Sequence, residues 1–387
     1  MIEARQEQLS RFPHRLSGSD QNSRAADLIQ EAFESLGLKT EVERFKVLGQ
    51  LAFGISLNVL APLIVFFFLK RPYWLAMILF GVSMVSLWGE LTFSFHLFRR
   101  VIPAHESCNV EGVIGQEVRA KKTVVIVAHH DTPKTGWLYR ASLADRLAPV
   151  LRSIPPPFNK IYFPPFLGAL GLGAALILRP WPSTGLICSV LAAASACVLG
   201  IVLLVTIQWG LSKPSPGAND NGSGVLVLLE LAERFSKKPQ ADISVHLLAT
   251  GAEEAGFFGV KNYLRRHKEL DKRDTFFINL DSVGGGELHW AVGEETLENI
   301  AYPVQGLDVL SDAECRSGGP VLPRIKINAP TDAGPVARKG YRVLTLIGLE
   351  NESIPPNFHK ASDTFERLDP NVLKRAAEAV ENFVRHI

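Results

Sequence analysis

The sequence predicts an α/β fold: a three-layer α/β/α domain with a mostly parallel central sheet, plus about four transmembrane helices inserted as two hairpins. Two observations predict this fold. In the polar parts of the chain, short β-rich runs alternate with amphipathic helical segments, which is the pattern of a sheet covered by helices. Between these parts stand long apolar blocks, which raise the hydrophobic fraction of the 387 residues to 47%.

The polar parts supply the elements of the domain. Residues 17–39 carry apolar side chains at helical spacing, and Gly37 is a typical residue for the end of that helix. After Lys213 the alternation becomes regular. Strands are expected at residues 40–47, 109–114, 123–128, 243–250, 276–280 and 342–347. Further helices are expected at residues 225–235, 257–266 and 370–387.

Four apolar blocks interrupt the polar chain, at residues 51–69, 73–88, 166–178 and 186–209. A spanning helix needs about 20 mostly apolar residues, and the first, second and fourth blocks meet that length. The third block is short unless it begins near Ile161, so a re-entrant or interfacial hairpin is its alternative. For all four blocks, the alternative to a membrane span is a buried helix of a large globular core.

Polar residues with metal-binding side chains stand where the apolar runs of the domain stop. They are His129, Asp220, Glu254, Asp281 and His359. In open α/β sheets, ligands bind outside the carboxyl ends of the strands, so these side chains are expected to share one site. Two imidazoles and three carboxylates suit zinc. One carboxylate can bridge two ions about 3.5–4 Å apart, which together would hold an attacking water.

Two further carboxylates have expected roles beside these ligands. Glu253 adjoins Glu254, and neighbouring side chains in extended backbone diverge, so Glu253 can face substrate and act as general base. Asp131 lies two residues after His129 and is expected to hydrogen-bond its imidazole. His130 should point away from both by strand alternation and is excluded as a ligand.

Each of these residues, taken singly, has a structural alternative. Asp220 stands in a Gly-Asn turn and would also suit a helix N-cap for the segment at 225–235. His359 would also suit an exposed surface position. Independent surface residues do not reproduce a complete two-metal set, so the set as a whole favours a metal centre.

Six short motifs carry a resemblance to a known family. They lie at residues 15–19, 128–131, 217–224, 251–256, 279–281 and 359–364. In this order, and in these structural settings, they resemble the M28 family of zinc aminopeptidases and related exopeptidases. The resemblance covers nearly all polar segments but not the apolar hairpins. It implies a zinc-exopeptidase-like domain whose three polar parts, residues 1–50, 99–160 and 211–387, are separated by hairpins at 51–98 and 161–210.

The resemblance also implies a division of roles. One zinc ion would be held by His129 and Asp281, the other by Glu254 and His359, with Asp220 between them. Glu253 would deprotonate the bridging water and later protonate the leaving amine. The Thr331-Asp332 segment would line the substrate pocket, and there Ala333 departs from the histidine that the family often has.

The expected function is that of a membrane-anchored, two-zinc metallo-exopeptidase, most simply an aminopeptidase acting on peptides. Two alternatives remain. A glutaminyl-cyclase-like acyl transferase resembles the same fold and works with one zinc. A non-catalytic membrane scaffold of the same fold would typically have lost ligands, whereas all five ligands and the base are present here.

Composition limits the partners. The formal net charge is +2 and no basic tract stands out, which argues against nucleic acid as a partner. The lipid bilayer is the expected partner of the apolar blocks, and the oligomeric state is left open. The four cysteines form no metal or disulfide pattern. The polar N-terminal segment contains no apolar region of the kind found in a signal peptide.

Basic residues near the span ends bear on the orientation of a multi-pass membrane protein. The turns of the hairpins carry Lys70, Arg71 and Arg179. More basic residues flank the spans on the side of the catalytic domain: Arg44, Lys46, Arg99, Arg100, Lys160 and Lys213. Because cytoplasmic segments carry the excess of Lys and Arg, this distribution favours a cytoplasmic catalytic domain. His129 precedes the second hairpin and Asp220 follows it, so a shared site requires an even number of crossings between them.

Overall fold

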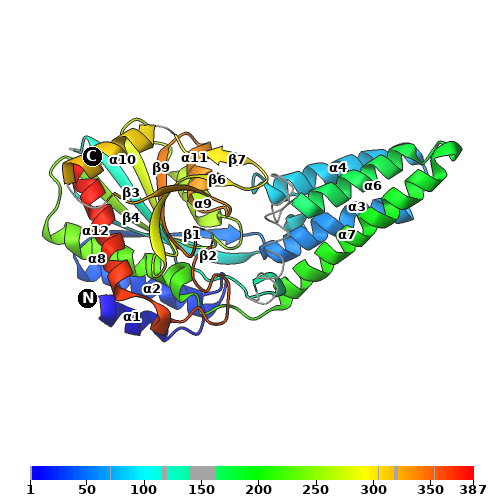
Figure 1. Cartoon of the computed structure of the whole chain (residues 1–387). Coiled ribbons are helices and arrows are strands. Elements are labelled where there is room, and N and C mark those ends of the chain that lie inside the picture. Colours follow the sequence, from blue (N-terminus) through cyan, green and yellow to red (C-terminus); the bar gives the residue numbers. More distant parts are fainter. Residues whose placement is uncertain are drawn as a thin grey trace.

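The computed structural model describes residues 2–69, 71–115, 120–139, 163–303, 305–317, 321–352 and 354–387. The chain forms an α/β domain and a bundle of apolar helices that projects from one end of it (Figure 1). Both chain termini lie on the side of the α/β domain remote from the bundle (Figure 1). Lys70, Lys160 and Ile161, which enter the membrane predictions above, lie outside the described residues.

The described residues build a central sheet of nine strands. The strands are β1 Lys39–Val47, β2 His105–Ile114, β3 Lys122–His129, β4 Ile243–Thr250, β5 Thr275–Asp281, β6 Glu287–Glu295, β7 Asn299–Ala301, β8 Arg324–Ile327 and β9 Arg342–Leu349. Their order is β1-β2-β4-β3-β5-β9-β6-β7, and β8 pairs with β6. The six predicted strands all form, as β1 to β5 and β9, while β6, β7 and β8 are additional.

The prediction of a mostly parallel sheet is wrong, because the sheet is mixed. The central strands β4, β3, β5 and β9 run parallel. Towards one edge β4, β2 and β1 are joined antiparallel, and towards the other so are β9, β6 and β7. The central strands β4 and β5 are buried along their whole length, so their sequences are continuous apolar runs. Such a run predicts a buried strand but carries no information on the direction of its neighbour.

Helices cover both faces of the sheet, as the three-layer prediction requires. The helices of the domain are α1 Ile2–Ser10, α2 Asp20–Ser35, α8 Ser223–Lys237, α9 Phe258–Arg266, α10 Gln305–Ser317, α11 Ala333–Arg338 and α12 Pro370–His386. Along β3, Val124 and Ile126 pack into a core formed with α2, α8 and α12. Val125 and Val127 face the opposite way and pack with α9 and α11. This alternation is the period of two expected of a strand between two helical layers.

The apolar blocks form the projecting bundle of four helices (Figure 1). They are α3 Leu51–Phe68, α4 Tyr73–Leu91, α6 Phe163–Leu178 and α7 Gly185–Leu211. Three helical stretches of the described chain, Leu51–Phe68, Tyr73–Leu91 and Pro182–Leu211, are long and apolar enough to cross a membrane. α6 has 16 residues and falls short of that length. The extension of the third block towards Ile161 lies outside the described residues.

The bundle has an apolar inside and an apolar outside. Val59, Leu87 and Leu199 are fully buried between its helices. Outward-facing Phe68 and Leu186 are 82% and 80% exposed. A globular core helix would bury such side chains, so the buried-core alternative does not describe this bundle. Large exposed apolar surfaces are typical of regions that contact a membrane or another apolar partner.

A buried ion pair joins the first helical hairpin to the α/β domain. Glu90, near the end of α4, accepts hydrogen bonds from the guanidinium of Arg99, and both side chains are fully buried. Arg99 also donates to the backbone carbonyl of Ala255 in the loop after β4. In α3, Gly54 leaves the space for this pair, because a Cβ there would lie 2.6 Å from both Arg99 Nε and Glu90 Oε1.

Replacing Arg99 by Met is expected to destabilise the protein by about 3–5 kcal/mol, because Glu90 would keep a buried charge with only the His96 imidazole, at 3.0 Å, as its partner. Adding Glu90→Leu to Arg99→Met should recover most of that loss, since no unpaired charge then remains. The measurement is the thermal unfolding midpoint of the full chain in lipid nanodiscs. A double variant no more stable than Arg99→Met alone would contradict the ion-pair explanation.

Candidate metal centre

The parallel part of the sheet brings the predicted site residues to one edge. His129 is the last residue of β3 and lies in register with Thr250, the last residue of β4. Glu253 and Glu254 follow β4 in a short loop, and Asp281 ends β5. Since β4, β3 and β5 are parallel neighbours, their carboxyl ends meet at this edge. Strand direction in the centre of the sheet therefore assembles the site, as the sequence predicted.

Asp220 comes from the irregular turn before α8. The carboxylate of Asp363 accepts hydrogen bonds from the backbone N–H groups of Asn219, at 2.8 Å, and Asp220, at 3.1 Å. This contact holds the turn against the segment that follows His359. The alternative role of Asp220 as a helix N-cap is wrong, because the N-cap of α8 is Gly222 and no side chain caps it.

The donor atoms of the five predicted ligands form two overlapping groups. In the first group, donor atoms of His129, Asp220 and Asp281 all lie within 4.8 Å of one another. The second group, Asp220, Glu254 and His359, meets the same limit. Asp220 belongs to both groups, and of these residues only Glu254 is more than slightly exposed. Such an arrangement would allow two adjacent cations to share one carboxylate.

Donor chemistry in both groups fits zinc. Each offers one imidazole and two carboxylates, which is a ligand set that zinc accepts with a position left for water or substrate. Asp220 Oδ2 lies 3.2 Å from His359 Nε2 and Asp220 Oδ1 lies 3.4 Å from His129 Nε2. Asp220 Oδ2 is buried, yet it makes no hydrogen bond to any described group. A buried carboxylate oxygen without a hydrogen bond, facing imidazole nitrogens, suits a cation between them.

The charges of the site also favour a cation. Burial, together with repulsion by Glu254, raises the pKa of Glu253 well above its usual range. Burial and the neighbouring carboxylate of Asp220 likewise raise the pKa of Glu254 well above its usual range. For Asp281, burial is the main cause that raises its pKa to about 6. Four carboxyl groups thus crowd around two imidazoles in a buried site, and divalent cations would relieve the repulsion between their charged forms.

Asp131 plays a different role from the one predicted. Its carboxylate lies 3.7 Å from His129 Nδ1 and makes no hydrogen bond to that ring. The backbone carbonyl of Asp131 takes that place, at 3.2 Å from His129 Nδ1. If Nδ1 carries the proton, Nε2 is left free to bind metal. The Asp131 carboxylate instead accepts the backbone N–H groups of Glu253, at 3.1 Å, and Glu254, at 3.2 Å, and so positions the loop that carries the proposed base.

Two further histidines, His130 and His246, make hydrogen bonds outside the metal groups. His130 contacts the side-chain amide of Asn22 and the carbonyl of Cys108, each at 3.0 Å. His246 contacts the Glu111 carboxylate at 2.8 Å. Strand alternation therefore predicted the direction of His130 correctly.

Two site residues had no assigned role in the sequence. Arg15 is fully buried and donates to the carbonyls of His130, Pro216 and Gly217, so it ties the end of β3 to the Asp220 turn. Its place in the motif at residues 15–19 is the sequence feature that could have indicated this role. Tyr139 packs its ring on the His359 imidazole at a centroid distance of 4.4 Å. No motif marks Tyr139.

The Thr331-Asp332 segment lies beside the same site. Thr250 donates to the Asp332 carboxylate at 2.6 Å, directly before the loop with Glu253. Burial raises the pKa of Asp332 to about 7. Asp332 is therefore a buried acid behind the metal groups, and Ala333 begins α11.

Comparisons with known proteins agree with this geometry. Residues 205–384 match Peptidase family M28, a stretch that contains every predicted ligand except His129. Aminopeptidase YwaD of Bacillus subtilis is 30% identical over 189 residues, which cover 46% of this chain and 39% of that protein. The chain thus matches about two fifths of the length of this curated relative.

Solved structures share the fold. An aminopeptidase from Aneurinibacillus sp. strain AM-1 superposes with a TM-score of 0.57 at 15% identity, covering 99% of this chain and 92% of the other. A glutaminyl cyclase from Bacteroides thetaiotaomicron has a TM-score of 0.57 at 14% identity, covering 100% of this chain and 97% of the other. At such identities these likenesses show the fold alone. The matched family segment and the curated relative show that the chain is similar to M28 aminopeptidases over nearly half of its length, in agreement with the shared fold.

Proposed function

We propose that this protein is a membrane-anchored metallo-exopeptidase that holds two zinc ions and removes N-terminal residues from peptides. The observation that carries the proposal is the membership of Asp220 in both groups of donor atoms. Two adjacent sites with a common carboxylate suit the hydrolysis of an amide bond, because both the attacking water and the developing oxyanion need stabilisation.

The metal ligands and Glu253 have different roles in the proposed reaction. Zinc bound by the two groups would supply Lewis acidity towards a water molecule and the scissile carbonyl. Glu253 lies within 4.8 Å of donor atoms of His129 and Glu254 and belongs to neither of the two groups that contain Asp220. It takes the proton from the attacking water and gives it to the leaving amine. Burial raises the pKa of Glu253, which is the direction that favours a group that both takes up and returns a proton.

A glutaminyl-cyclase-like acyl transferase is the second candidate. The likeness in fold to a solved glutaminyl cyclase favours it. Such an enzyme would use one zinc ion, whereas two of the three donor groups among the described residues share Asp220 and could hold adjacent ions. The same two groups argue against a non-catalytic scaffold, which has no need for a complete donor set or for Glu253 beside it.

The helical bundle is proposed to anchor the enzyme as a multi-pass membrane protein. Three helices of spanning length and the exposed apolar surface of the bundle support contact with a lipid bilayer. α6, which is shorter, forms the second hairpin with α7, and α7 returns the chain to the side of the α/β domain. The basic residues that flank the spans, Arg99 and Arg100 among them, favour a cytoplasmic catalytic domain.

Zinc removal tests the proposed function. The full chain, purified in nanodiscs, is expected to bind two zinc ions and to release the N-terminal residue of aminoacyl amides and unblocked peptides. A chelator should abolish release, added zinc should restore it, and N-acetylated peptides should resist. The measurements are zinc per chain by mass spectrometry and product release by chromatography. One zinc per chain with cyclisation of N-terminal glutamine would favour the cyclase, and release that survives the loss of zinc would contradict both enzymes.

A further inference from the structure

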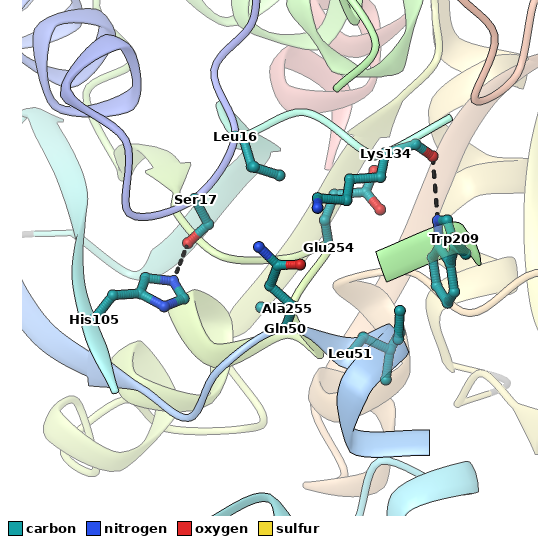
Figure 2. A pocket seen from close by; sticks show the side chains of 10 residues that line it. Leu16, Ser17, Gln50, Leu51, His105, Lys134, Trp209, Glu254 and Ala255 are labelled. Carbon is teal, nitrogen blue, oxygen red and sulfur yellow. Dashed lines mark hydrogen bonds between the residues drawn. The ribbon is translucent and has the colours of Figure 1, made fainter. Parts of the chain in front are cut away.

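A pocket lies between the metal centre and the root of the helical bundle (Figure 2). It holds about 410 Å³ of empty space, part of it open to solvent. Glu254, a member of the second donor group, lines one side. Leu51 and Ala52 at the start of α3, and Trp209 near the end of α7, line the side towards the bundle. Both helical hairpins therefore contribute to a pocket that opens beside the proposed metals.

Most polar groups around the pocket already make hydrogen bonds to other protein groups. Ser17 Oγ and His105 Nε2 lie 3.0 Å apart in a hydrogen bond, and the indole N–H of Trp209 donates to the carbonyl of Lys134 at 3.2 Å (Figure 2). The Lys134 ammonium donates to the carbonyl of Gly210 in α7. Most of the remaining lining is side-chain carbon. A pocket of this kind takes an apolar group, because apolar surface gains by leaving water and satisfied polar groups offer little in exchange.

Gln50 supplies one polar atom that makes no hydrogen bond to any described group. This residue precedes α3 and lines the pocket beside Leu51. Its side-chain Oε1 is buried and accepts no hydrogen bond from any described group. An unsatisfied amide oxygen is costly, and a ligand that donates an N–H would satisfy it. The pocket thus offers an apolar cavity and one hydrogen-bond acceptor, which together match a peptide unit with an apolar side chain.

We propose that this pocket binds an apolar side chain of the peptide substrate, at one of the two residues that flank the scissile bond. The inference rests on the proposed function, because Glu254 links the pocket to the metal centre. Gln50 then accepts a backbone N–H of the same peptide. Since Leu51, Ala52 and Trp209 belong to the hairpins, the membrane bundle sets substrate specificity in addition to anchoring the enzyme.

Filling the pocket tests this inference. Ala52→Leu places a larger side chain at the lining, and Ala61→Leu makes the same change one helix face away in α3, at a residue that does not line the pocket. The substrates are dipeptide amides Ala-Xaa and Xaa-Ala, with Gly, Ala, Leu or Phe as Xaa. At one of the two positions, wild type should prefer Leu and Phe to Gly. Ala52→Leu should reduce that preference in kcat/KM by about tenfold or more, the range for a changed apolar contact, and Ala61→Leu should retain it.

A second variant distinguishes a change in substrate preference from misfolding of Ala52→Leu. Leu51→Ala enlarges the pocket and should shift the preference from Leu towards Phe. If wild type hydrolyses these amides and both lining variants keep its preferences, the pocket inference is overturned while the proposed function stands. If wild type hydrolyses none of them, the proposed function fails. The binding of the same amides to the zinc-loaded chain, measured by calorimetry, then tests the pocket inference separately. If wild type binds Leu amides more tightly than Gly amides, and Ala52→Leu loses this difference, the pocket inference is supported. Equal binding of the two amides by wild type would overturn it.

Discussion

Replacing Glu253 by Gln is expected to lower kcat for peptide hydrolysis by about 10²–10⁴-fold, the usual contribution of a positioned general base. The proposed metals should stay bound, because Glu253 belongs to neither donor group that contains Asp220. Gln has nearly the same shape as Glu, so the loop held by Asp131 should keep its place. The loss should therefore fall on the chemical step and leave zinc content and KM almost unchanged.

Steady-state kinetics and zinc content, measured on the same preparation, check this result. Glu287→Gln is a matched control, because Glu287 is an exposed carboxylate at the start of β6. It should behave as wild type. A Glu253→Gln enzyme with full activity and full zinc would show that another group takes the proton. An inactive variant without zinc would place Glu253 among the ligands.

Replacing Asp220 by Asn is expected to weaken zinc binding at both positions by at least about 100-fold. Loss of a residue that merely supports a ligand typically costs 10–100-fold, and Asp220 is a proposed ligand in both groups. The amide keeps the size of the side chain but removes the negative charge that the two imidazoles and the metals share. Peptide hydrolysis should fall with zinc occupancy.

Thermal unfolding measures this loss without any substrate. A ligand at 100 times its dissociation constant stabilises the folded state by about 2.7 kcal/mol, so zinc should raise the unfolding midpoint of wild type. The same zinc concentration should give Asp220→Asn a much smaller rise. Asp242→Asn is the control, since Asp242 is an exposed residue paired with Lys121. An equal response to zinc in Asp220→Asn and wild type would remove Asp220 from the metal centre.

Local patterns were enough to locate most of the sheet. The runs at 243–250 and 276–280 are buried along their whole length, so hydrophobicity alone marks them as strands. β6 escaped prediction because charged residues stand at both of its ends and its apolar part is short. The mixture of parallel and antiparallel strands was also not predicted, because the pairing of strands depends on where the connecting segments lead the chain.

The metal-type residues were found because they follow apolar runs and because their motifs occur in the order of a known family. The role of Asp131 could not be found in that way. It was expected to hydrogen-bond the ring of His129; its carboxylate lies 3.7 Å from Nδ1 of that ring, but its hydrogen bonds go to two backbone N–H groups of the loop after β4. The partner of a side chain is set by which loop packs against it, and spacing in the sequence does not report that.

The sequence by itself determined the α/β alternation, the four apolar blocks and the residues able to bind metal, because each depends on the local order of side chains. Only the tertiary structure decided that Glu90 in an apolar helix is paired with Arg99, and that the hairpin ends line a pocket beside Glu254. These features join segments far apart in the chain. Their physical cause is packing, which selects one arrangement from the many that the same local patterns allow.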